Sequence, residues 1–384
     1  MDDESSMMRK SYLPFLPSHS RGFSIIETMV GMVIALAATL IIFQMYSAFE
    51  GQKRTTTSGA DATENGMFAT LSIERDARMA GAGIADSNLF SCANIFSYFD
   101  NGTTQTSPAP NFVGGLLSLM PVRIIDGGNA PDTITFTYGN SVRSGISSAI
   151  SKNMPQPSAE LDVVSTAGFR LNDLVIVAQG GNCTVMQITQ VQPAAYKIQH
   201  NPGNAPSYNP AANFQNANSW PAYNAGAQVF SLGGGTTQRT YSVGTSGPTL
   251  ALMAQLPTDA APVATVGDIV SLQAQYGIAP VGSQQVNCWV NATLGNACDA
   301  SDWANPTSAN ILRIKAIRIA VVARSALSER QTAGVCTATT AANAPQSWTG
   351  GPAIDLTANA NWQCYRYKTF QTIIPLRNVL WANL

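Results

Sequence analysis

The stretch Arg21-Gly22-Phe23-Ser24-Ile25-Ile26-Glu27 is followed directly by an apolar run that continues to Phe49. Within this run the only charged side chain is Glu27, and there is no proline. As a helix, the run is long enough to cross the apolar core of a bilayer, which takes about 20 residues. A carboxylate near the start of such a helix costs roughly 3 kcal/mol in lipid, so Glu27 needs a specific partner.

Three interpretations of this junction compete. A cleavable secretory signal has a short apolar centre and a small-x-small exit, for which Ala35-Leu36-Ala37 is the candidate. The apolar run continues well past that exit, however, and Glu27 would lie inside the apolar centre. A plain membrane anchor fits the length of the run but leaves Glu27 unexplained.

The third interpretation is a resemblance. Gly22-Phe23, with a glutamate at the fifth position after the glycine, resembles the recognition site of type IV prepilins, with cleavage between Gly22 and Phe23. The resemblance implies that a prepilin peptidase removes residues 1–22 as a leader and methylates the new amino terminus at Phe23. It also implies that the Glu27 carboxylate pairs with a terminal amine, either its own or that of a neighbouring subunit. On a helix, Glu27 lies one turn beyond Phe23 on the same face.

Composition favours an extracytoplasmic domain and argues against some classes of partner. The chain is 45% hydrophobic but only 11% charged, and its net charge of −1 provides no basic surface for nucleic acid. Low charge together with many Gly, Pro, Asn, Thr and Ser residues is typical of a β-rich domain with long loops. Val, Ile, Tyr and Phe recur in strand-like blocks, which argues against disorder.

The first long helix is predicted over residues 23–80, and Gly81-Ala82-Gly83 supplies its stop. Two apolar stripes follow its second half at helical spacing. One stripe consists of Met67, Phe68 and Leu71, and the other of Ala62, Ala69, Ile73, Ala77 and Ala80. Two stripes are consistent with contacts to neighbouring subunits in a fibre, and equally with a core helix that is covered on two sides.

Residues 81–384 are predicted to form a β-rich globular domain. Strand-like blocks include 133–138, 161–164, 174–178, 183–188, 196–198, 228–230 and 239–243. The last two are predicted to extend one sheet, with Gly233-Gly234-Gly235 turning between them. Near the carboxy terminus, 311–322 is predicted as a central strand and 365–374 as its partner.

Blocks in the last third of the chain sharpen the resemblance. They are Asp268-Ile269-Val270-Ser271-Leu272-Gln273 with Gln275-Tyr276-Gly277, then Val322-Ala323-Arg324-Ser325, and then Ile374-Pro375-Leu376-Arg377-Asn378. These blocks resemble the PilW family of minor pilins, which is related to the J-type minor pseudopilin of type II secretion. The resemblance implies an α+β, type IV pilin-like fold, in which a long amino-terminal membrane helix packs on an antiparallel, β-rich, disulfide-bonded domain.

Six cysteines follow the apolar run, and an even number in an oxidising compartment favours three disulfides. Six cysteines allow several pairings. The expected pairs are Cys288–Cys298, which closes a short loop, and Cys336–Cys364, which tethers a Gly/Ala/Thr-rich loop to the final strand; Cys92 and Cys183 remain as the third pair. A zinc site is disfavoured, because there is no C-x-x-C and the ligand spacing does not fit.

The sequence offers no catalytic constellation, cofactor motif or metal motif. Of the two histidines, His19 leaves with the predicted leader and His200 is interpreted as a solvated turn residue. No nucleophile elbow, phosphate loop or dinucleotide fingerprint is present. Asp126, Asn129 and Asp132 are interpreted as a turn, since their spacing is not that of a calcium loop. The sequence therefore predicts a protein that is not an enzyme and has no cofactor.

A long loop is predicted near 198–238, where no Asp, Glu, Lys or Arg occurs. Within it, residues 201–226 carry four aromatic residues: Tyr208, Phe214, Trp220 and Tyr223. One interpretation is an irregular loop whose aromatics cover a local strand edge. The other is a contact surface, because exposed aromatics among Asn and Ser favour protein interfaces.

Taken with the resemblance, these features predict a non-enzymatic minor pilin that joins other minor pilins in a priming or tip complex for type IV pilus assembly. The implied partners are the prepilin peptidase, other minor pilins, the major pilin and a tip adhesin. The implied location is the inner membrane, with a periplasmic domain, and then the pilus on the cell surface. The alternatives are a J-like pseudopilin of a type II secretion system and a membrane-anchored periplasmic binding or enzymatic domain.

Overall fold

A computed structural model of the chain describes residues 22–140, 144–155, 160–203, 206–296, 298–329, 331, 334–351, 354–357, 359 and 361–381. The predicted leader therefore lies outside the described residues, apart from Gly22. The chain divides into two compact units between Arg54 and Thr55. Each unit is described by itself.

The first unit contains the amino-terminal part of one long helix, α1 (Ile25–Met79). The helix begins two residues later than predicted, and the backbone N–H of Ile26 meets the hydroxyl of Ser24 at 3.4 Å. Its apolar window has no buried residue, and by length and composition it can cross a membrane. A helix that exposes Val, Ile, Leu and Phe along its whole length in this way is suited to lipid or to other helices.

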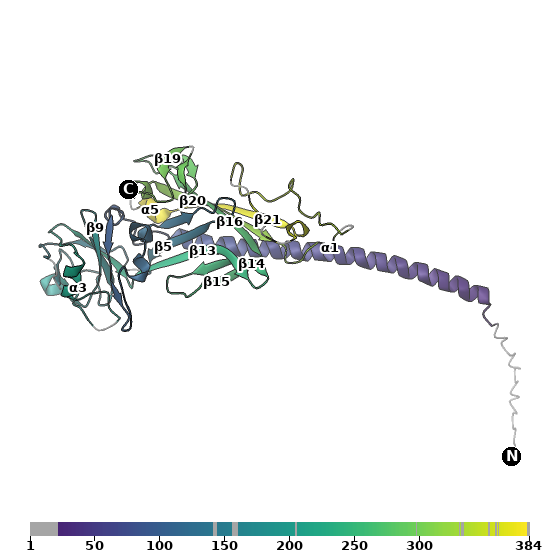
Figure 1. The fold of residues 1–384 in the computed structure, drawn as a ribbon, viewed down its shortest axis with the longest axis horizontal. Helices are drawn as coiled ribbons and strands as arrows, with labels where there is room; N and C mark the ends of the chain where they lie inside the picture. The colour runs from purple at the N-terminus through teal and green to yellow at the C-terminus, as the bar shows by residue number, and fades with distance from the viewer. Residues whose placement is uncertain are drawn as a thin grey trace, which may run out of the picture. The chain divides into compact units, whose positions relative to one another are not determined.

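The second unit begins with the rest of α1, which lies against a four-stranded sheet of order β17-β16-β20-β21 (Figure 1). These strands are β16 (Ile269–Ile278), β17 (Cys288–Val290), β20 (Ile314–Arg324) and β21 (Tyr367–Pro375). Neighbouring strands in this sheet are antiparallel. The predicted pairing of the two long carboxy-terminal segments is confirmed, since Ile317 lies opposite Ile374 and Val321 opposite Phe370.

A second sheet has the order β15-β14-β13-β5-β4. Its strands are β4 (Val122–Ile125), β5 (Thr133–Gly139), β13 (Thr236–Ser246), β14 (Thr249–Gln255) and β15 (Val263–Gly267). Side chains from this sheet, from the first sheet and from α1 form one apolar core, to which Ile73, Phe136, Tyr241 and Ile317 belong. The globular part of α1 is therefore a core helix on one of its sides.

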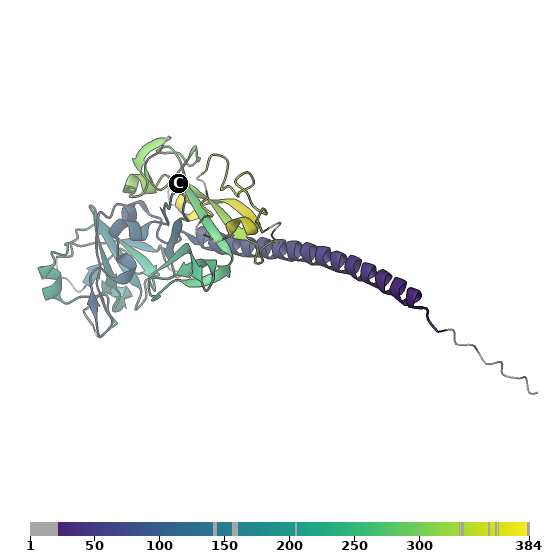
Figure 2. The same ribbon diagram turned by 45° about the vertical axis from the view of Figure 1, so that its right-hand side comes forward.

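A third sheet, of order β1-β9-β8-β12-β6, lies in a separate region of the second unit (Figure 2). Its strands are β1 (Asn94–Phe96), β6 (Ser147–Ala149), β8 (Leu174–Gln179), β9 (Asn182–Gln187) and β12 (Gln228–Gly233). β1 is parallel to β9, and the other pairs are antiparallel. Alternate residues of β8 enter two different cores, Ile176 one and Val177 the other, because successive side chains point to opposite faces of a strand.

The remaining elements are short. A three-stranded sheet contains β7 (Glu160–Asp162), β10 (Gln190–Gln192) and β11 (Lys197–Gln199). Two hairpin pairs are β2 (Phe99–Asp100) with β3 (Gln105–Thr106), and β18 (Leu294–Asn296) with β19 (Asp299–Asp302). The short helices are α2 (Ser87–Phe90), α3 (Ala212–Ala217), α4 (Ser308–Ile311), α5 (Arg377–Trp381), η1 (Pro110–Phe112), η2 (Gly115–Leu119), η3 (Pro193–Ala195) and η4 (Trp362–Cys364). The α+β class with a long amino-terminal helix is confirmed.

Three local predictions were wrong. β12 and β13 do not extend one sheet across the glycines between them; β12 pairs with β8 and β6, and β13 pairs with β5 and β14. The predicted central strand begins at Ile314, because the residues before it form α4, and a short apolar run fits either structure. The predicted loop near 198–238 contains β11, α3 and β12, and isolated bridges join Ser207 to Asp100 and Tyr223 to Met154.

Candidate assembly surface

One face of α1 is built for close contact with the sheet. Ala62, Gly66, Ala69, Ile73 and Ala77 are buried along this face. At Gly66 the approach leaves no room for a side chain, since a Cβ there would lie 2.0 Å from Cε2 of the Phe370 ring on β21. Small residues at this spacing let the helix backbone lie directly on the aromatic and aliphatic side chains of the sheet.

The buried acid Asp76 holds the same face of α1 nearer its carboxy-terminal end. Asp76 is 3% exposed, and its Oδ2 accepts a hydrogen bond from the hydroxyl of Tyr241 at 2.8 Å. Arg239 Nε lies 3.5 Å from the same oxygen, and Arg75 Nε lies 3.3 Å from Oδ1. Burial, and then the hydrogen bond to Asp76, raises the pKa of Tyr241 to about 12. The phenol therefore stays protonated and donates to Asp76 at physiological pH.

Polar contacts from the last strands hold other turns of α1. Lys368 Nζ on β21 donates to Thr63 Oγ1 at 2.7 Å, and Thr55 Oγ1 donates to Glu329 at 2.9 Å. Glu329 also accepts from Arg366 Nε at 2.7 Å. The helix is therefore attached to the segment that follows β20, through Glu329, and to β21, through Lys368.

The carboxy-terminal end of α1 is capped by Asn378 on α5. Its side-chain amide Nδ2 lies 3.3, 3.3 and 3.1 Å from the carbonyl oxygens of Arg78, Met79 and Ala80. The last carbonyls of a helix have no partner within the helix itself, so a side-chain donor from elsewhere in the chain satisfies them.

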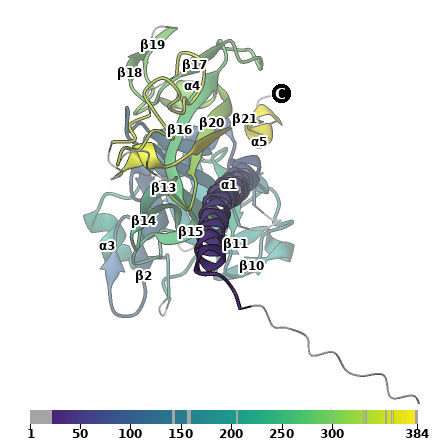
Figure 3. The same ribbon diagram turned by 90° about the vertical axis from the view of Figure 1, so that its right-hand side faces the viewer.

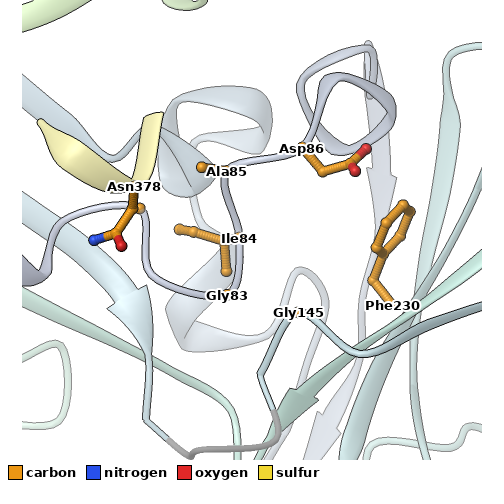
Figure 4. A pocket seen from close by; sticks show the side chains of 8 residues that line it. Gly83, Ile84, Ala85, Asp86, Gly145, Phe230 and Asn378 are labelled. Carbon is orange, nitrogen blue, oxygen red and sulfur yellow. The ribbon is translucent and has the colours of Figure 1, made fainter. Parts of the chain in front are cut away.

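The chain leaves α1 through a tight joint beside this cap (Figure 4). Gly81 N–H donates to the carbonyl of Thr137, and Gly83 has a φ of +70°. A Cβ at Gly83 would lie 2.3 Å from Cβ of Ser144, so only glycine fits. A pocket of about 170 Å³ opens here, with Asn378 and Phe230 on opposite sides in Figure 4. The one acid among its described lining residues, Asp86, is the N-cap of α2, so this pocket is part of the joint.

The other face of α1 is apolar and exposed. Met67 is 52% exposed, and Phe68 and Leu71 are each 55% exposed. These three residues are the stripe that the sequence left open between a subunit contact and a second core face. Within the described residues, the second unit covers the alanine-rich stripe and leaves Met67, Phe68 and Leu71 more than half exposed. Met67, Phe68 and Leu71 are named the exposed stripe below.

Gly22, Phe23 and Glu27 of the amino-terminal motif are all exposed. Gly22 has no neighbour within 4 Å of its would-be Cβ, and Phe23 is 82% exposed. Phe23 precedes the first helical residue, so the predicted one-turn relation between Phe23 and Glu27 is not formed in the full chain. Glu27 lies in the first turn of α1, where a negative charge is favourable because of the helix dipole.

The structure pairs the cysteines as the sequence analysis expected. The Cα–Cα distances are 5.5 Å for Cys92–Cys183, 6.3 Å for Cys288–Cys298 and 4.6 Å for Cys336–Cys364. The first pair joins the end of α2 to β9 inside an apolar core. The third pair joins the loop at 334–351 to η4, just before β21.

The aromatic residues of the predicted contact loop mostly face inward. Trp220 is 7% exposed and Tyr223 is 1% exposed, so these two are not available to a partner. Their rings and those of Tyr208 and Phe214 cover β1 and β2: the pairs are Phe96–Trp220, Tyr98–Phe214 and Phe99–Tyr208. The structure therefore favours the interpretation in which the aromatics cover a local strand edge.

Two titratable residues, His200 and Asp132, are buried. His200 is 3% exposed, so its interpretation as a solvated turn residue was wrong. The chain after β11 is held down, because Asn201 N–H donates to Thr189 Oγ1 and Asn209 donates to the carbonyl of Asn201. Burial lowers the pKa of His200 to about 4.

Asp132 lies in the turn that the sequence predicted, and it is buried. Its oxygens accept from the backbone N–H groups of Gly127 and Ala274 at 2.8 and 2.7 Å, which attaches the turn to β16. Burial outweighs these bonds and raises the pKa of Asp132 to about 7. Across the described residues, no group of three His, Cys, Asp or Glu side chains is close enough to hold a metal ion.

Sequence reasoning missed the residues that seat α1. Gly66 and Asp76 carried a signal, since a glycine and an acid interrupt an otherwise alanine-rich stripe. Phe370, Tyr241 and Asn378 carried none, because their partners on α1 are more than 160 residues away in sequence.

The blocks that resemble the PilW family meet in space. Asp268 Oδ1 accepts from Arg324 Nη2 at 2.6 Å, and Arg324 N–H donates to the carbonyl of Asp268. The block at 374–378 continues β21 and ends at Asn378, the cap of α1. These blocks therefore form one framework around β16, β20 and β21, against which α1 packs.

Comparison with known proteins agrees with this framework. Residues 240–378 match the family model described as type IV pilus-assembly protein W, a match that covers a little over a third of the chain and ends at Asn378. No curated protein and no solved structure matches the chain. By this match, residues 240–378 are similar to the PilW family of type IV pilus-assembly proteins.

Proposed function

We propose that this protein is a minor pilin that is inserted in the inner membrane, processed at Gly22-Phe23 and assembled with other minor pilins into a priming or tip complex. The observation that carries the proposal is the two-sided character of α1. One side is seated on the rest of the second unit by Gly66, Asp76 and Asn378, while the described residues of that unit leave the exposed stripe on the other side more than half exposed. An apolar helix face of this kind is suited to another helix.

The amino-terminal motif supplies the second part of the proposal. Removal of the leader would give Phe23 a free amine, and extension of α1 to this new terminus would place the amine one turn before Glu27. In lipid, a carboxylate without a cationic partner is costly, so Glu27 pairs with that amine or with the amine of a neighbouring subunit. Pairing between subunits would guide a new subunit into position before its helix is covered.

The first experiment measures processing at the amino terminus. Intact mass and terminal peptides of the protein, purified from membranes, should show a chain that begins with N-methylated Phe23. Gly22→Val should leave the leader attached, since a side chain before the cut obstructs close approach of the peptidase. A mature protein that retains residues 1–22 would contradict the proposal and favour a plain membrane anchor.

The second experiment separates processing from assembly. Glu27→Val should still be cleaved and inserted, because the costly charge is gone. It should no longer cross-link to other minor pilins. Glu27→Val that is processed and cross-links as the wild type does would remove the carboxylate from the mechanism.

The third experiment tests the exposed stripe. Phe68→Ser with Leu71→Asp should leave the domain folded, since both side chains are more than half exposed. The same variant should lose cross-linking to other pilus subunits. Val164→Asp is the matched control, because Val164 is 63% exposed and lies outside α1. Equal cross-linking of both variants would show that the stripe is not an assembly surface.

A further inference from the structure

A second feature of the PilW framework is a cation without a counter-charge at the start of β20. Lys315 is 4% exposed, and no hydrogen bond or ion pair joins its ammonium to another described residue. Burial lowers the pKa of Lys315, and no carboxylate contributes to the shift. A largely buried ammonium without an acid is unfavourable, because the charge loses part of its hydration without gaining a partner.

An irregularity in the pairing of β16 with β20 sets the position of Lys315. Ile278 lies opposite Ile314 and Gly277 lies opposite Ala316, so Lys315 is the extra residue of a β-bulge. A bulge re-aims the side chain of its extra residue and is often found next to functional sites. On its other side, the carbonyl of Lys315 accepts from the N–H of Leu376, which fixes the backbone there at 2.8 Å.

Lys315 lines a pocket of about 320 Å³ between the turn at Pro280–Gln284 and the residues that follow α4. Ala309 of α4 also lines the pocket, and α4 is labelled close to β17 in Figure 3. Among its described lining residues there is no Asp or Glu. Val281, at the rim, is 85% exposed. The pocket therefore combines an unpaired cation with an open, apolar rim.

The neighbouring Arg313, in contrast to Lys315, has partners for its charge. Arg313 also lines the pocket, but its Nη2 meets Asp299 Oδ2 at 2.6 Å and its Nη1 donates to Asn310 at 3.0 Å. Its Nε donates to the carbonyl of Ala279, so the guanidinium also holds the chain just before Pro280. The charge of Arg313 is thus balanced within the chain, and that of Lys315 is not.

We propose that the Lys315 pocket binds a carboxylate, supplied by an acidic side chain of a neighbouring subunit in the pilus complex. The source of the carboxylate rests on the proposed assembly function; the carboxylate chemistry does not. An acidic side chain that enters the pocket would pair with the ammonium, while the chain that carries it would cover Val281 and Pro280.

The chemistry is tested with sodium acetate on the full chain in detergent. The thermal unfolding temperature of the wild type should rise with acetate, relative to sodium chloride at equal ionic strength. Lys315→Met should lose this rise, and should itself unfold at a higher temperature than the wild type in chloride, because an uncompensated buried charge is gone. Lys152→Met is the matched control, since Lys152 is an exposed lysine already paired with Asp162, and it should respond to acetate as the wild type does.

Lys315→Arg keeps the charge and should retain part of the acetate response. It therefore serves as the test if Lys315→Met does not fold. A wild type without an acetate response, or a response that is unchanged in Lys315→Met, would overturn the proposal that the Lys315 pocket binds a carboxylate. So would an experimental structure in which the ammonium of Lys315 is already paired with a carboxylate of its own chain.

The source is tested in cells with a photo-reactive amino acid at position 281, and at position 164 as the control. The expected result is a cross-link from position 281 to a pilus-subunit peptide that contains Asp or Glu. Lys315→Glu should then reduce the cross-link, and replacing that acid by lysine should restore it. An acetate response without such a cross-link, in cells where leader processing and Glu27-dependent assembly are normal, would overturn the subunit as the source but not the assembly function.

Discussion

Asn378 donates its side-chain amide to the carbonyl oxygen of Ala80 at 3.1 Å, across 298 residues of sequence. Two further carbonyls, of Arg78 and Met79, lie 3.3 Å from the same nitrogen. The end of the PilW match is therefore in contact with the end of the helix that begins in the apolar amino-terminal run. This contact joins two parts of the chain that are 298 residues apart in sequence.

Asn378→Ala should weaken this contact. Three helix carbonyls lose their side-chain donor, and we expect a loss of about 1–2 kcal/mol in the free energy of unfolding. The measurement is urea unfolding of the full chain in detergent. Asn216→Ala is the control, because Asn216 is exposed on α3, and it should change stability by less than about 0.5 kcal/mol. Equal losses in the two variants would contradict the capping role.

Gly66→Ala should destabilise the seating of α1. The new Cβ would lie 2.0 Å from the Phe370 ring, so the ring or the helix must move, at a cost of about 1–3 kcal/mol. Gly59→Ala on the same helix is the control, because nothing lies within 4 Å of its would-be Cβ. Gly59→Ala should stabilise the protein by up to about 1 kcal/mol. A stabilising Gly66→Ala would show that α1 is not held tightly against β21.

His200 should make the fold sensitive to mild acid. Its pKa is about 4 in the folded chain and about 6.5 when unfolded, so between these values the unfolded chain binds more protons. The stabilising contribution is complete above pH 6.5 and declines as the pH falls toward 4. Between pH 7 and pH 5 the expected loss is about 2 kcal/mol.

His200→Gln should remove this loss, which is measured as the difference between the two pH profiles of unfolding free energy. The comparison is needed because Asp132 acts in the opposite direction. With its pKa raised to about 7, it makes the fold more stable as the pH falls from 7 toward 4. Profiles that run parallel for the wild type and His200→Gln would show that His200 is hydrated in solution.

The disulfides should differ in their contributions. Cys92–Cys183 spans 91 residues, Cys336–Cys364 spans 28 and Cys288–Cys298 spans 10. On the chain-entropy account, replacing both cysteines of a pair by serine should cost about 4–5 kcal/mol for the first and about 2–3 kcal/mol for the last. Unfolding of the oxidised double variants measures the order. Peptide mapping without reduction should recover the three pairs, and free thiols at Cys288 and Cys298 would rule out the shortest loop.

Much of the architecture could be predicted from local patterns. Three local patterns were informative: the apolar run with one acid, the absence of proline from Phe23 to Gly83, and the alternation of apolar and polar residues after Gly83. Each of them depends only on residues that are near one another in sequence. They were enough to predict α1, the β-rich domain and the pairing of β20 with β21. Local patterns could not separate α4 from the start of β20. A short apolar run is compatible with a buried helical turn and with a buried strand, so its periodicity does not distinguish them.

The residues of the candidate surfaces likewise divide into those that the sequence identifies and those that only the structure identifies. The motif residues Gly22, Phe23 and Glu27 could be named from sequence, because their chemistry depends on neighbours in the chain. Which stripe of α1 is covered could not, because both stripes are apolar and only contact with β21 distinguishes them. The burial of Trp220 and Lys315 was equally beyond the sequence, since an uncharged aromatic loop and a basic strand residue are each compatible with exposure.

The sequence by itself determined that a membrane-length helix with a single acid precedes a β-rich domain with six cysteines, because hydrophobic length, periodicity and composition are properties of contiguous residues. The tertiary structure alone decided that Phe370 lies on Gly66, that Asn378 caps α1 and that Lys315 is buried without an acid among the described residues. These relationships depend on which strands pair and in which register, and register is set by the packing of the whole core.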